Sequence, residues 1–117
     1  MAQVFSKVLS PTDITRKLAL PIKAFNRFHF PEGVNYVHFM VTDSDGIRYN
    51  FRLAKRNSGN YSKPEITGGW RQFARNKGLQ PGDMVTLNVQ QGEAGAVHYI
   101  IKVTKMIRLF GRRIYEA

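Results

Sequence analysis

The feature that most restricts the fold is the strict alternation of apolar and polar residues in IRYNFRL, residues 47–53. In an extended chain its two sets of side chains fall on opposite sides: Ile47, Tyr49, Phe51 and Leu53 against Arg48, Asn50 and Arg52. The pattern predicts a strand with one buried face and one basic face. The preceding segment YVHFMVT (36–42) is rich in strand-forming residues, and DSDG (43–46) supplies a tight turn. We therefore expect a β-hairpin over residues 36–53.

Four other segments have strand-like composition: QVFSKVL (3–9), KLALP (17–21), MVTLNV (84–89) and AVHYIIKVTKM (96–106). The last two are joined by QQGEAG (90–95), which predicts a second hairpin. We found no internal repeat and no linker, and 117 residues suffice for one hydrophobic core. The sequence thus predicts a single, mainly β domain.

Two segments follow a helical period instead. In LPIKAFNRFHF (20–30), Pro21 suits a first helical turn, Phe25 and Phe28 are three residues apart, and Pro31 follows the end. GGWRQFARNKG (68–78) spaces two aromatic residues, Trp70 and Phe73, by three and ends at a glycine suited to a helix C-terminus. We expect two short helices that close the ends of a small barrel.

The charge balance is strongly basic. Eighteen Lys and Arg residues against eight Asp and Glu give a net charge of 18 − 8 = +10, which favours polyanionic partners such as nucleic acid. The absence of Cys excludes disulfides, thiolate metal sites and Cys nucleophiles, and favours a reducing intracellular compartment. The start MAQVFSKVLS lacks a signal-peptide pattern, and no run approaches the ~18 apolar residues of a membrane span. We expect a protein that is neither secreted by that route nor membrane-spanning.

No constellation of catalytic residues is evident. His29, His38 and His98 are far apart in the sequence and none has a metal-ligand spacing. Most acids fall in predicted turns or loops, and neither a nucleophile elbow nor a phosphate-binding glycine loop is present. We therefore predict a protein that is not an enzyme and uses no metal or cofactor.

The cations, in contrast, are clustered. Residues 48–63 contain five cations and no acid, and a weaker basic stretch covers residues 10–27. Residues 55–60 combine Lys55, suited to phosphate, with side chains that hydrogen-bond to base edges: Arg56, Asn57, Ser58 and Asn60. This composition predicts a loop that contacts nucleic acid, and a merely solvated hairpin loop is the alternative.

Two longer segments resemble a known family. VFSKVLSPTDITRKLALPIKAF (4–25) is similar to the opening of the plant B3 DNA-binding domain, and EITGGWRQFARNKGLQPGDMVTLNV (65–89) is similar to its second signature. Five residues of that signature coincide: Trp70, Phe73, Leu79, Gly82 and Asp83. From the residues alone, the two aromatics are core and Gly82 with Asp83 forms a turn. The resemblance covers residues 4–104 of a single domain (1–117) and leaves a basic C-terminal extension, 105–117.

The resemblance implies a seven-stranded open pseudo-barrel with two short α-helices, which grips the major groove of double-stranded DNA with two arms. The implied N-arm is Ser10–Lys17, with Ser10, Thr12, Thr15, Arg16 and Lys17 as DNA-binding residues. The implied C-arm is Arg52–Tyr61, with Arg52, Lys55, Arg56, Asn57, Ser58 and Asn60. Lys23 and Lys63 are candidate phosphate contacts.

The C-arm also departs from the family. Some members carry W-N-S-S-Q-S-Y where this chain has RNSGNY, so Asn57, Ser58 and Tyr61 match, Arg56 replaces the Trp and one residue is missing. The DNA target of those members is therefore not implied.

The sequence as a whole predicts a duplex-binding domain of a plant nuclear transcriptional regulator. One alternative is a single-stranded nucleic-acid-binding barrel of the OB type, which would need exposed aromatic residues for base stacking. The other is a basic protein-interaction barrel whose charge only keeps it in solution.

Overall fold

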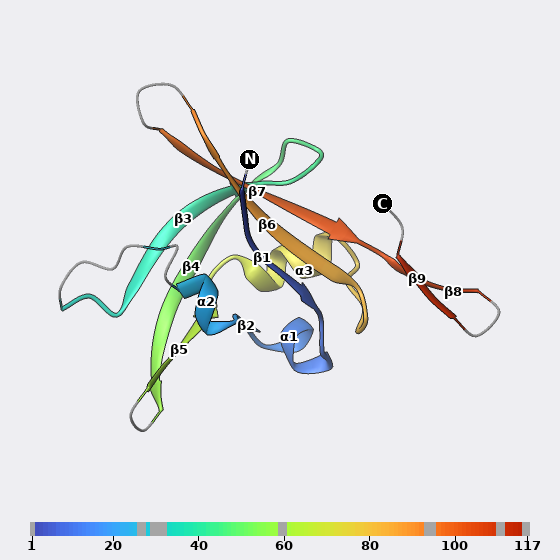
Figure 1. The fold of residues 1–117 in the computed structure, drawn as a ribbon, viewed down its shortest axis with the longest axis horizontal. Helices are drawn as coiled ribbons and strands as arrows, with labels where there is room; N and C mark the ends of the chain where they lie inside the picture. The colour runs from blue at the N-terminus through green and yellow to red at the C-terminus, as the bar shows by residue number, and fades with distance from the viewer. Residues whose placement is uncertain are drawn as a thin grey trace.

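The structure is a computed structural model. It describes residues 2–25, 28, 33–58, 61–92, 96–109 and 112–115, and their side chains except at 22, 25, 56–58, 61–63, 107–109 and 112–115. Seven strands form one mixed sheet: β1 (Ala2–Val8), β2 (Leu18–Ala19), β3 (Tyr36–Thr42), β4 (Arg48–Ser58), β5 (Tyr61–Ile66), β6 (Met84–Gln91) and β7 (Val97–Thr104). Figure 1 shows β3, β4 and β5 on one side of the molecule, β6 and β7 on the other, and α3 (Trp70–Asn76) between them.

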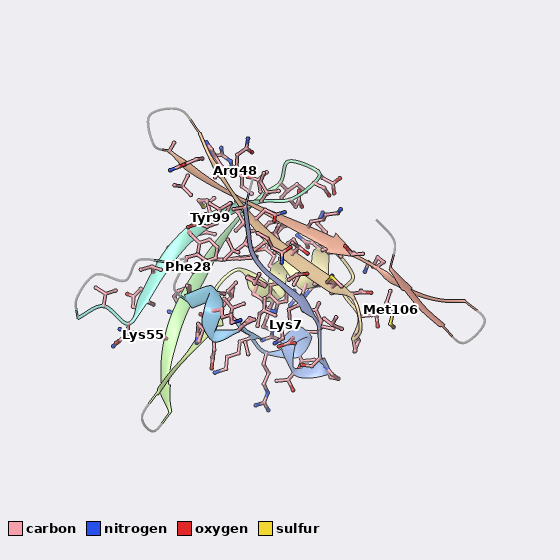
Figure 2. The ribbon with its side chains drawn as sticks, in the orientation of Figure 1. Lys7, Phe28, Arg48, Lys55, Tyr99 and Met106 are labelled. Carbon is pink, nitrogen blue, oxygen red and sulfur yellow. The ribbon has the colours of Figure 1, made fainter. Side chains whose placement is uncertain are left out.

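The strand order is β1-β6-β7-β3-β4-β5-β2, with β3 and β7 parallel and the other neighbours antiparallel. Both predicted hairpins are present: Phe39 pairs with Phe51 in one, and Leu87 pairs with Ile101 in the other. The edge strands β1 and β2 leave the barrel open. The side chain of Lys7, on β1, spans this gap (Figure 2). Its Nζ donates to the carbonyl of Ala19, on β2, at a distance of 2.6 Å. The predicted seven-stranded open pseudo-barrel is confirmed.

The two predicted helices are present as α2 (Ile22–Phe25) and α3. α3 matches the prediction, and Gly78 beyond its end has φ +59°. α2 is shorter than predicted. Phe28 is not helical, and its ring lies 5.6 Å from that of Tyr99 and 5.1 Å from that of Phe39, so packing on the sheet competes with the helical period. Residues 26, 27, 29 and 30 of that prediction lie outside the described residues.

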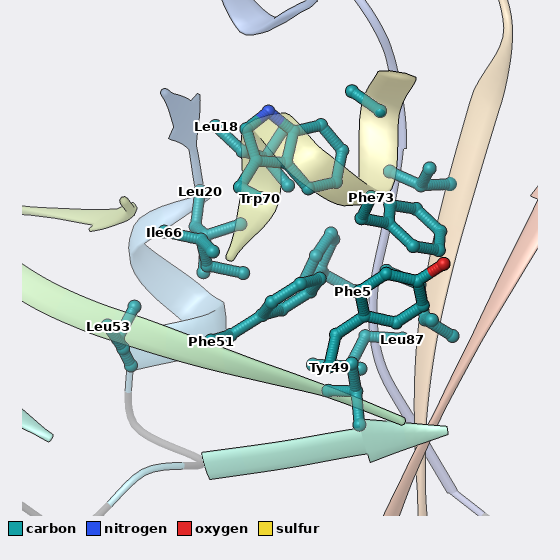
Figure 3. Packing of buried hydrophobic residues seen from close by; sticks show 14 of the residues in the cluster. Phe5, Leu18, Leu20, Tyr49, Phe51, Leu53, Ile66, Trp70, Phe73 and Leu87 are labelled. Atoms are coloured by element: carbon teal, nitrogen blue, oxygen red, sulfur yellow. The ribbon is translucent and has the colours of Figure 1, made fainter. Parts of the chain in front are cut away.

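The core centres on Phe51, Trp70 and Phe73, each fully buried (Figure 3). Their ring centroids lie 5.7 to 6.1 Å apart, within the range of favourable aromatic pairs. The positions of Trp70 and Phe73 confirm the sequence prediction. Gly69, which precedes the helix, has φ +75°, and a Cβ there would collide with the carbonyl of Asn50, so only glycine brings Trp70 this close to β4.

One residue of the alternating segment departs from the prediction. Ile47 is 50% exposed, because it lies in the turn before β4 rather than within the strand, and the inward pattern begins at Tyr49.

The C-terminal extension forms an unpredicted second sheet of two strands, β8 (Met106–Leu109) and β9 (Arg112–Tyr115). The Asp83 carboxylate fixes its start: Oδ1 accepts from the Met106 backbone N at 2.9 Å, and Oδ2 accepts from Lys105 Nζ at 3.1 Å. Oδ2 also accepts from Gln80 N, so the predicted turn at Gly82 and Asp83 joins β6 to the extension.

Candidate nucleic-acid interface

The predicted N-arm contains a helical turn, α1 (Pro11–Thr15), which the sequence analysis did not assign. Ser10 is its N-cap: Ser10 Oγ accepts from Asp13 N at 3.2 Å, and Asp13 Oδ2 accepts from Ser10 N at 2.8 Å. The Trp70 indole Nε1 donates to the Asp13 carbonyl at 2.6 Å, and Lys7 Nζ lies 3.0 Å from Asp13 Oδ1. The arm is thus stabilised by its own capping box and by two contacts from outside, with Trp70 and Lys7.

This arrangement separates the predicted N-arm residues by role. The Ser10 hydroxyl is used in the cap, and Thr15 Oγ1 donates to the carbonyl of Pro11 at 3.0 Å. Thr12 and Arg16 are exposed. Lys17 Nζ pairs with Glu65 Oε2 on β5 at 2.8 Å. Thr12 and Arg16 are therefore the N-arm side chains best placed to meet a partner, whereas Ser10 and Lys17 also stabilise the arm.

Over the described residues 55–58, the predicted C-arm is a strand paired with β5 rather than a loop. β4 continues to Ser58, and its register with β5 joins Lys55 to Pro64, Arg56 to Lys63, Asn57 to Ser62 and Ser58 to Tyr61. The prediction of a loop was therefore wrong for residues 55–58. Amide and cationic residues suit loops locally, but pairing with β5 outweighs that preference. Asn60 lies outside the described residues, and so do the side chains of Arg56, Asn57, Ser58 and Lys63.

The pairing of Arg56 with Lys63 places two cationic residues at directly opposite positions. Like charges in directly opposite positions generally destabilise a strand pair. Lys55 precedes this pair on the strand and is partly exposed (Figure 2).

The two arms adjoin each other. β2, which follows the N-arm, pairs with β5 through Leu18–Ile66 and Ala19–Glu65, and the same two residues of β5 pair with the base of the C-arm on β4. The Lys17–Glu65 ion pair reinforces this junction. Lys23, the candidate phosphate contact on α2, is exposed, and α2 also packs against β5. The sheet thus brings the N-arm, Lys23 and the C-arm to one region.

At the base of the C-arm, Arg52 lies on the outer face of β4, as the alternation predicted. Its Nε donates to Thr67 Oγ1 at 3.1 Å, and its guanidinium carbon lies 5.2 Å from the centroid of the Tyr36 ring. Arg48 and Asn50 on the same strand are also exposed.

Lysines and arginines have different roles in the described part of the chain. Each described carboxylate forms an ion pair with a lysine: Lys7–Asp13, Lys17–Glu65, Lys77–Asp43, Lys77–Asp45 and Lys105–Asp83. No described arginine side chain forms an ion pair within 4.0 Å, and all are exposed: Arg16, Arg48, Arg52, Arg71 and Arg75. The lysine pairs support the fold, and the arginines leave positive charge available to an anionic partner.

Two carboxylates of the supporting pairs have lowered pKa values. Burial raises the pKa of Asp43, but hydrogen bonds from Lys77 and from the backbone of Ile47 and Asp45 outweigh it and leave the pKa below its usual value. Burial also raises the pKa of Asp83, but hydrogen bonds from Met106, Gln80 and Lys105 outweigh it, so this pKa too lies below its usual value. Both carboxylates bond to backbone N–H groups and lysines of the fold, so these shifts concern stability.

Over the residues described here, no group of three or more His, Asp and Glu side chains could hold a metal ion. His38 and His98 are exposed on β3 and β7, and His29 lies outside the described residues. Among the described helices, none has the length and apolar content to cross a membrane.

Sequence reasoning missed three residues at this surface. Tyr36 and Thr67 contact Arg52, and Arg71 on α3 borders an open groove that Thr15 of α1 also lines. Tyr36 could have been found only from the β3–β4 register, which places it two positions from the partner of Arg52. Arg71 is visible in the helical period, on the face opposite Trp70 and Phe73.

A half-open β-barrel whose two adjoining arms carry Arg16 and Arg52, neither of them ion-paired with a described residue, has the features of a polyanion-binding module. The family model of the B3 DNA binding domain matches residues 5–104. The chain belongs to this family, which confirms the resemblance inferred from the sequence.

Two similar proteins extend the comparison. The chain is 31% identical over 117 residues to the putative AP2/ERF and B3 domain-containing protein Os01g0140700 of Oryza sativa subsp. japonica, with 90% of this chain and 36% of the relative covered. The chain therefore spans about a third of that protein. The structure also resembles that of the Arabidopsis FUS3-DNA complex, with a TM-score of 0.74, 24% identity, and coverage of 88% of this chain and 97% of that chain. The likeness to the solved structure supports the fold.

Proposed function

We propose that this chain binds double-stranded DNA through the major groove, with its N-arm and C-arm, as part of a plant transcriptional regulator that acts in the nucleus. The proposal rests chiefly on one observation: the two arms adjoin each other through β2 and β5, and their described arginines, Arg16 and Arg52, have no carboxylate partner among the described residues. Membership of the B3 DNA binding domain family and the likeness to a protein solved in complex with DNA support it.

The proposed interface combines two kinds of contact, one to phosphates and one to bases. Arg16, Lys23, Lys55 and Lys63 supply charge to phosphates and set the register of the duplex. Arg56 and Asn57 belong to the residue types that make two-point contacts, Arg to guanine O6 and N7 and Asn to adenine N6 and N7. The chain acts as a binding module and not as an enzyme, because recognition of this kind requires no bond to be broken.

Selection of binding sites from random duplexes, followed by competition with single strands of the selected sequence, tests the proposal. We expect an enriched duplex site and weaker competition by single strands. Stronger binding to single strands would favour an OB-type function. Binding to acidic proteins but not to duplex would favour the protein-interaction alternative.

A further inference from the structure

The Arg52 side chain is held in place from two sides. Thr67 Oγ1 accepts from Arg52 Nε at 3.1 Å, and the Tyr36 ring lies under the guanidinium at 5.2 Å. A guanidinium has five N–H donors, and the Nε bond uses one of them. Stacking on an aromatic face leaves the edge with the Nη groups open to a further partner. Such an arrangement fixes the group without neutralising its charge.

The backbone around Arg52 is also fixed. Arg52 N donates to the carbonyl of Gly68 at 3.1 Å, and Thr67 N donates to the carbonyl of Arg52 at 2.8 Å. A Cβ at position 68 would lie only 3.1 Å from Arg52 Cβ, so the glycine lets the 67–68 segment pack closely on β4. The Tyr36 ring, in turn, meets His38 edge-on at 5.7 Å on β3.

This positioning has no evident purpose within the fold. Arg52 and Tyr36 are both exposed, Tyr36 by 50%, and no described carboxylate pairs with Arg52. A long cationic side chain at the surface ordinarily keeps its rotamer freedom, and losing that freedom is a cost of binding. Fixing Arg52 in advance would remove this cost for a ligand that the open edge of the guanidinium meets.

We infer that Tyr36 and Thr67 are positioning residues that hold Arg52 as a preorganised clamp for one backbone phosphate at the base of the C-arm. The inference rests on the proposed DNA binding. Arg52 contributes affinity without sequence preference, since phosphate is the same at every base step. Arg56 and Asn57, further along the same strand, are left to contact bases.

A double-mutant cycle tests this role with binding to the selected duplex and to an unrelated duplex as readouts. Arg52→Ala should weaken binding to both duplexes and reduce the salt slope of log K by about 0.9, the value for one phosphate. Tyr36→Ala and Thr67→Val keep the charge but free the side chain, so each should weaken binding roughly two- to tenfold on both duplexes. Neither should change base preference.

Coupling decides whether these residues act through Arg52. In the Arg52→Ala background, Tyr36→Ala should have little further effect on DNA affinity. With Arg52 present, Tyr36→Phe should keep most of the affinity that Tyr36→Ala loses, because phenylalanine retains the aromatic face. Met40→Ala is the matched control, because Met40 is also 50% exposed on the same face of β3 but is paired with Asn50. It should bind like the parent. Thermal melting of each variant checks that the fold is retained.

The outcomes separate this inference from the proposed function. A parent protein that fails to bind duplex contradicts the function itself. A parent that binds duplex while Arg52→Ala leaves both affinity and salt slope unchanged overturns the clamp alone. A Tyr36→Ala effect that persists fully without Arg52 also overturns it, since Tyr36 would then act by a direct contact.

Discussion

Trp70 connects parts of the chain that are far apart in sequence. Its ring is fully buried between Phe51 and Phe73, and its Nε1 bonds to the carbonyl of Asp13 in the N-arm. The same side chain therefore stabilises the core and fixes the position of α1. A single residue of the core, Trp70, thus also holds the N-arm of the candidate site.

Trp70→Ala should lower the free energy of unfolding by ~3–5 kcal/mol, because it leaves a large cavity in a small domain. Urea unfolding followed by circular dichroism measures the change. Trp70→Phe is the control that keeps most of the apolar volume and removes only the N–H donor. We expect it to cost less, about 1–3 kcal/mol, since the Asp13 carbonyl loses its partner.

DNA binding by the folded fraction provides a second readout. Trp70→Ala should reduce binding only in proportion to the protein that unfolds. A well-folded Trp70→Ala protein that had lost DNA binding would show that the indole contacts DNA, contrary to its buried position.

Lys77 ties α3 to the turn between β3 and β4. Its Nζ, just beyond the helix, lies 2.7 Å from Asp43 Oδ2 and 2.9 Å from Asp45 Oδ2. Asp43 is buried and also accepts from the backbone N of Asp45 and Ile47, whereas Asp45 is exposed. This contact holds the helix that carries Trp70 against the first hairpin.

The lowered pKa values of Asp43 and Asp83 predict a loss of stability in acid. Each group contributes stability that is complete above its unfolded pKa, near 3.8, and is lost as the pH falls through the lower folded value. The raised pKa of Lys77, caused by the hydrogen bonds that its ammonium donates to the Asp43 and Asp45 carboxylates, gives a contribution that is complete below 10.5 and lost at higher pH. Urea unfolding from pH 2 to 7 should therefore show stability falling below about pH 4.

Asp43→Asn should reduce the loss of stability at low pH (the acid limb of the stability curve), because one of the two carboxylates with a lowered pKa is gone. Asp45→Asn is the matched control, since it removes the exposed partner of the same lysine, and its acid limb should stay close to that of the parent. Identical acid limbs in Asp43→Asn and the parent would contradict the assignment.

The C-arm separates two kinds of recognition along one strand. Lys55→Ala should weaken binding to all duplexes alike and reduce the salt slope by about one unit. Asn57→Ala should instead cost ~1–3 kcal/mol on the preferred duplex, relax discrimination at one base pair, and leave non-specific binding nearly intact. Arg56→Ala should show some of both effects. Site-selection profiles of all three variants that match the parent at every position would remove this arm from the site.

Elements with a strong local pattern were predictable from sequence. The alternation that starts at Tyr49 is visible along the chain, and Trp70 and Phe73 carry a helical period. The end of β4 was not predictable, because residues 54–58 lack alternation and become a strand only through pairing with β5. α1 had a usable signal, a serine followed by proline and then Asp13 three residues on, which is a capping box. This signal was not used, because the resemblance to the B3 family assigned residues 10–17 to the N-arm.

The candidate site was predictable as two charged segments but not as an arrangement. Sequence placed Arg52 on an outer face, yet its contacts with Tyr36 and Thr67 depend on the β3–β4 register and on the packing of the 67–68 segment. Similarly, Lys17 was predicted as a DNA-binding residue of the N-arm, and the structure pairs it with Glu65. Net charge is a property of composition, but which charges remain unpaired depends on the fold.

For the whole molecule, that division predicts how binding responds to salt. The 18 Lys and Arg residues overstate the number of cations available to DNA, because four described lysines are paired with carboxylates: Lys7, Lys17, Lys77 and Lys105. If about five cations of the two arms meet phosphates, log K should fall against log salt with a slope of roughly −4.5. Fluorescence anisotropy with a labelled duplex at several salt concentrations measures it.

Matched variants locate the charges responsible for that slope. Arg16→Ala, on the N-arm and free of ion pairs with described residues, should make the slope shallower by about 0.9. Lys102→Ala removes a cation that is also exposed, from β7 outside both arms, and should leave the slope unchanged even though the net charge falls by the same amount. In a defined interface, a cation that contacts phosphate affects the salt slope more than a distant cation, whose interaction is screened by salt. Equal effects of the two substitutions would therefore mean that DNA binding depends only on the overall charge. A parent slope near zero would contradict DNA binding through these arms altogether.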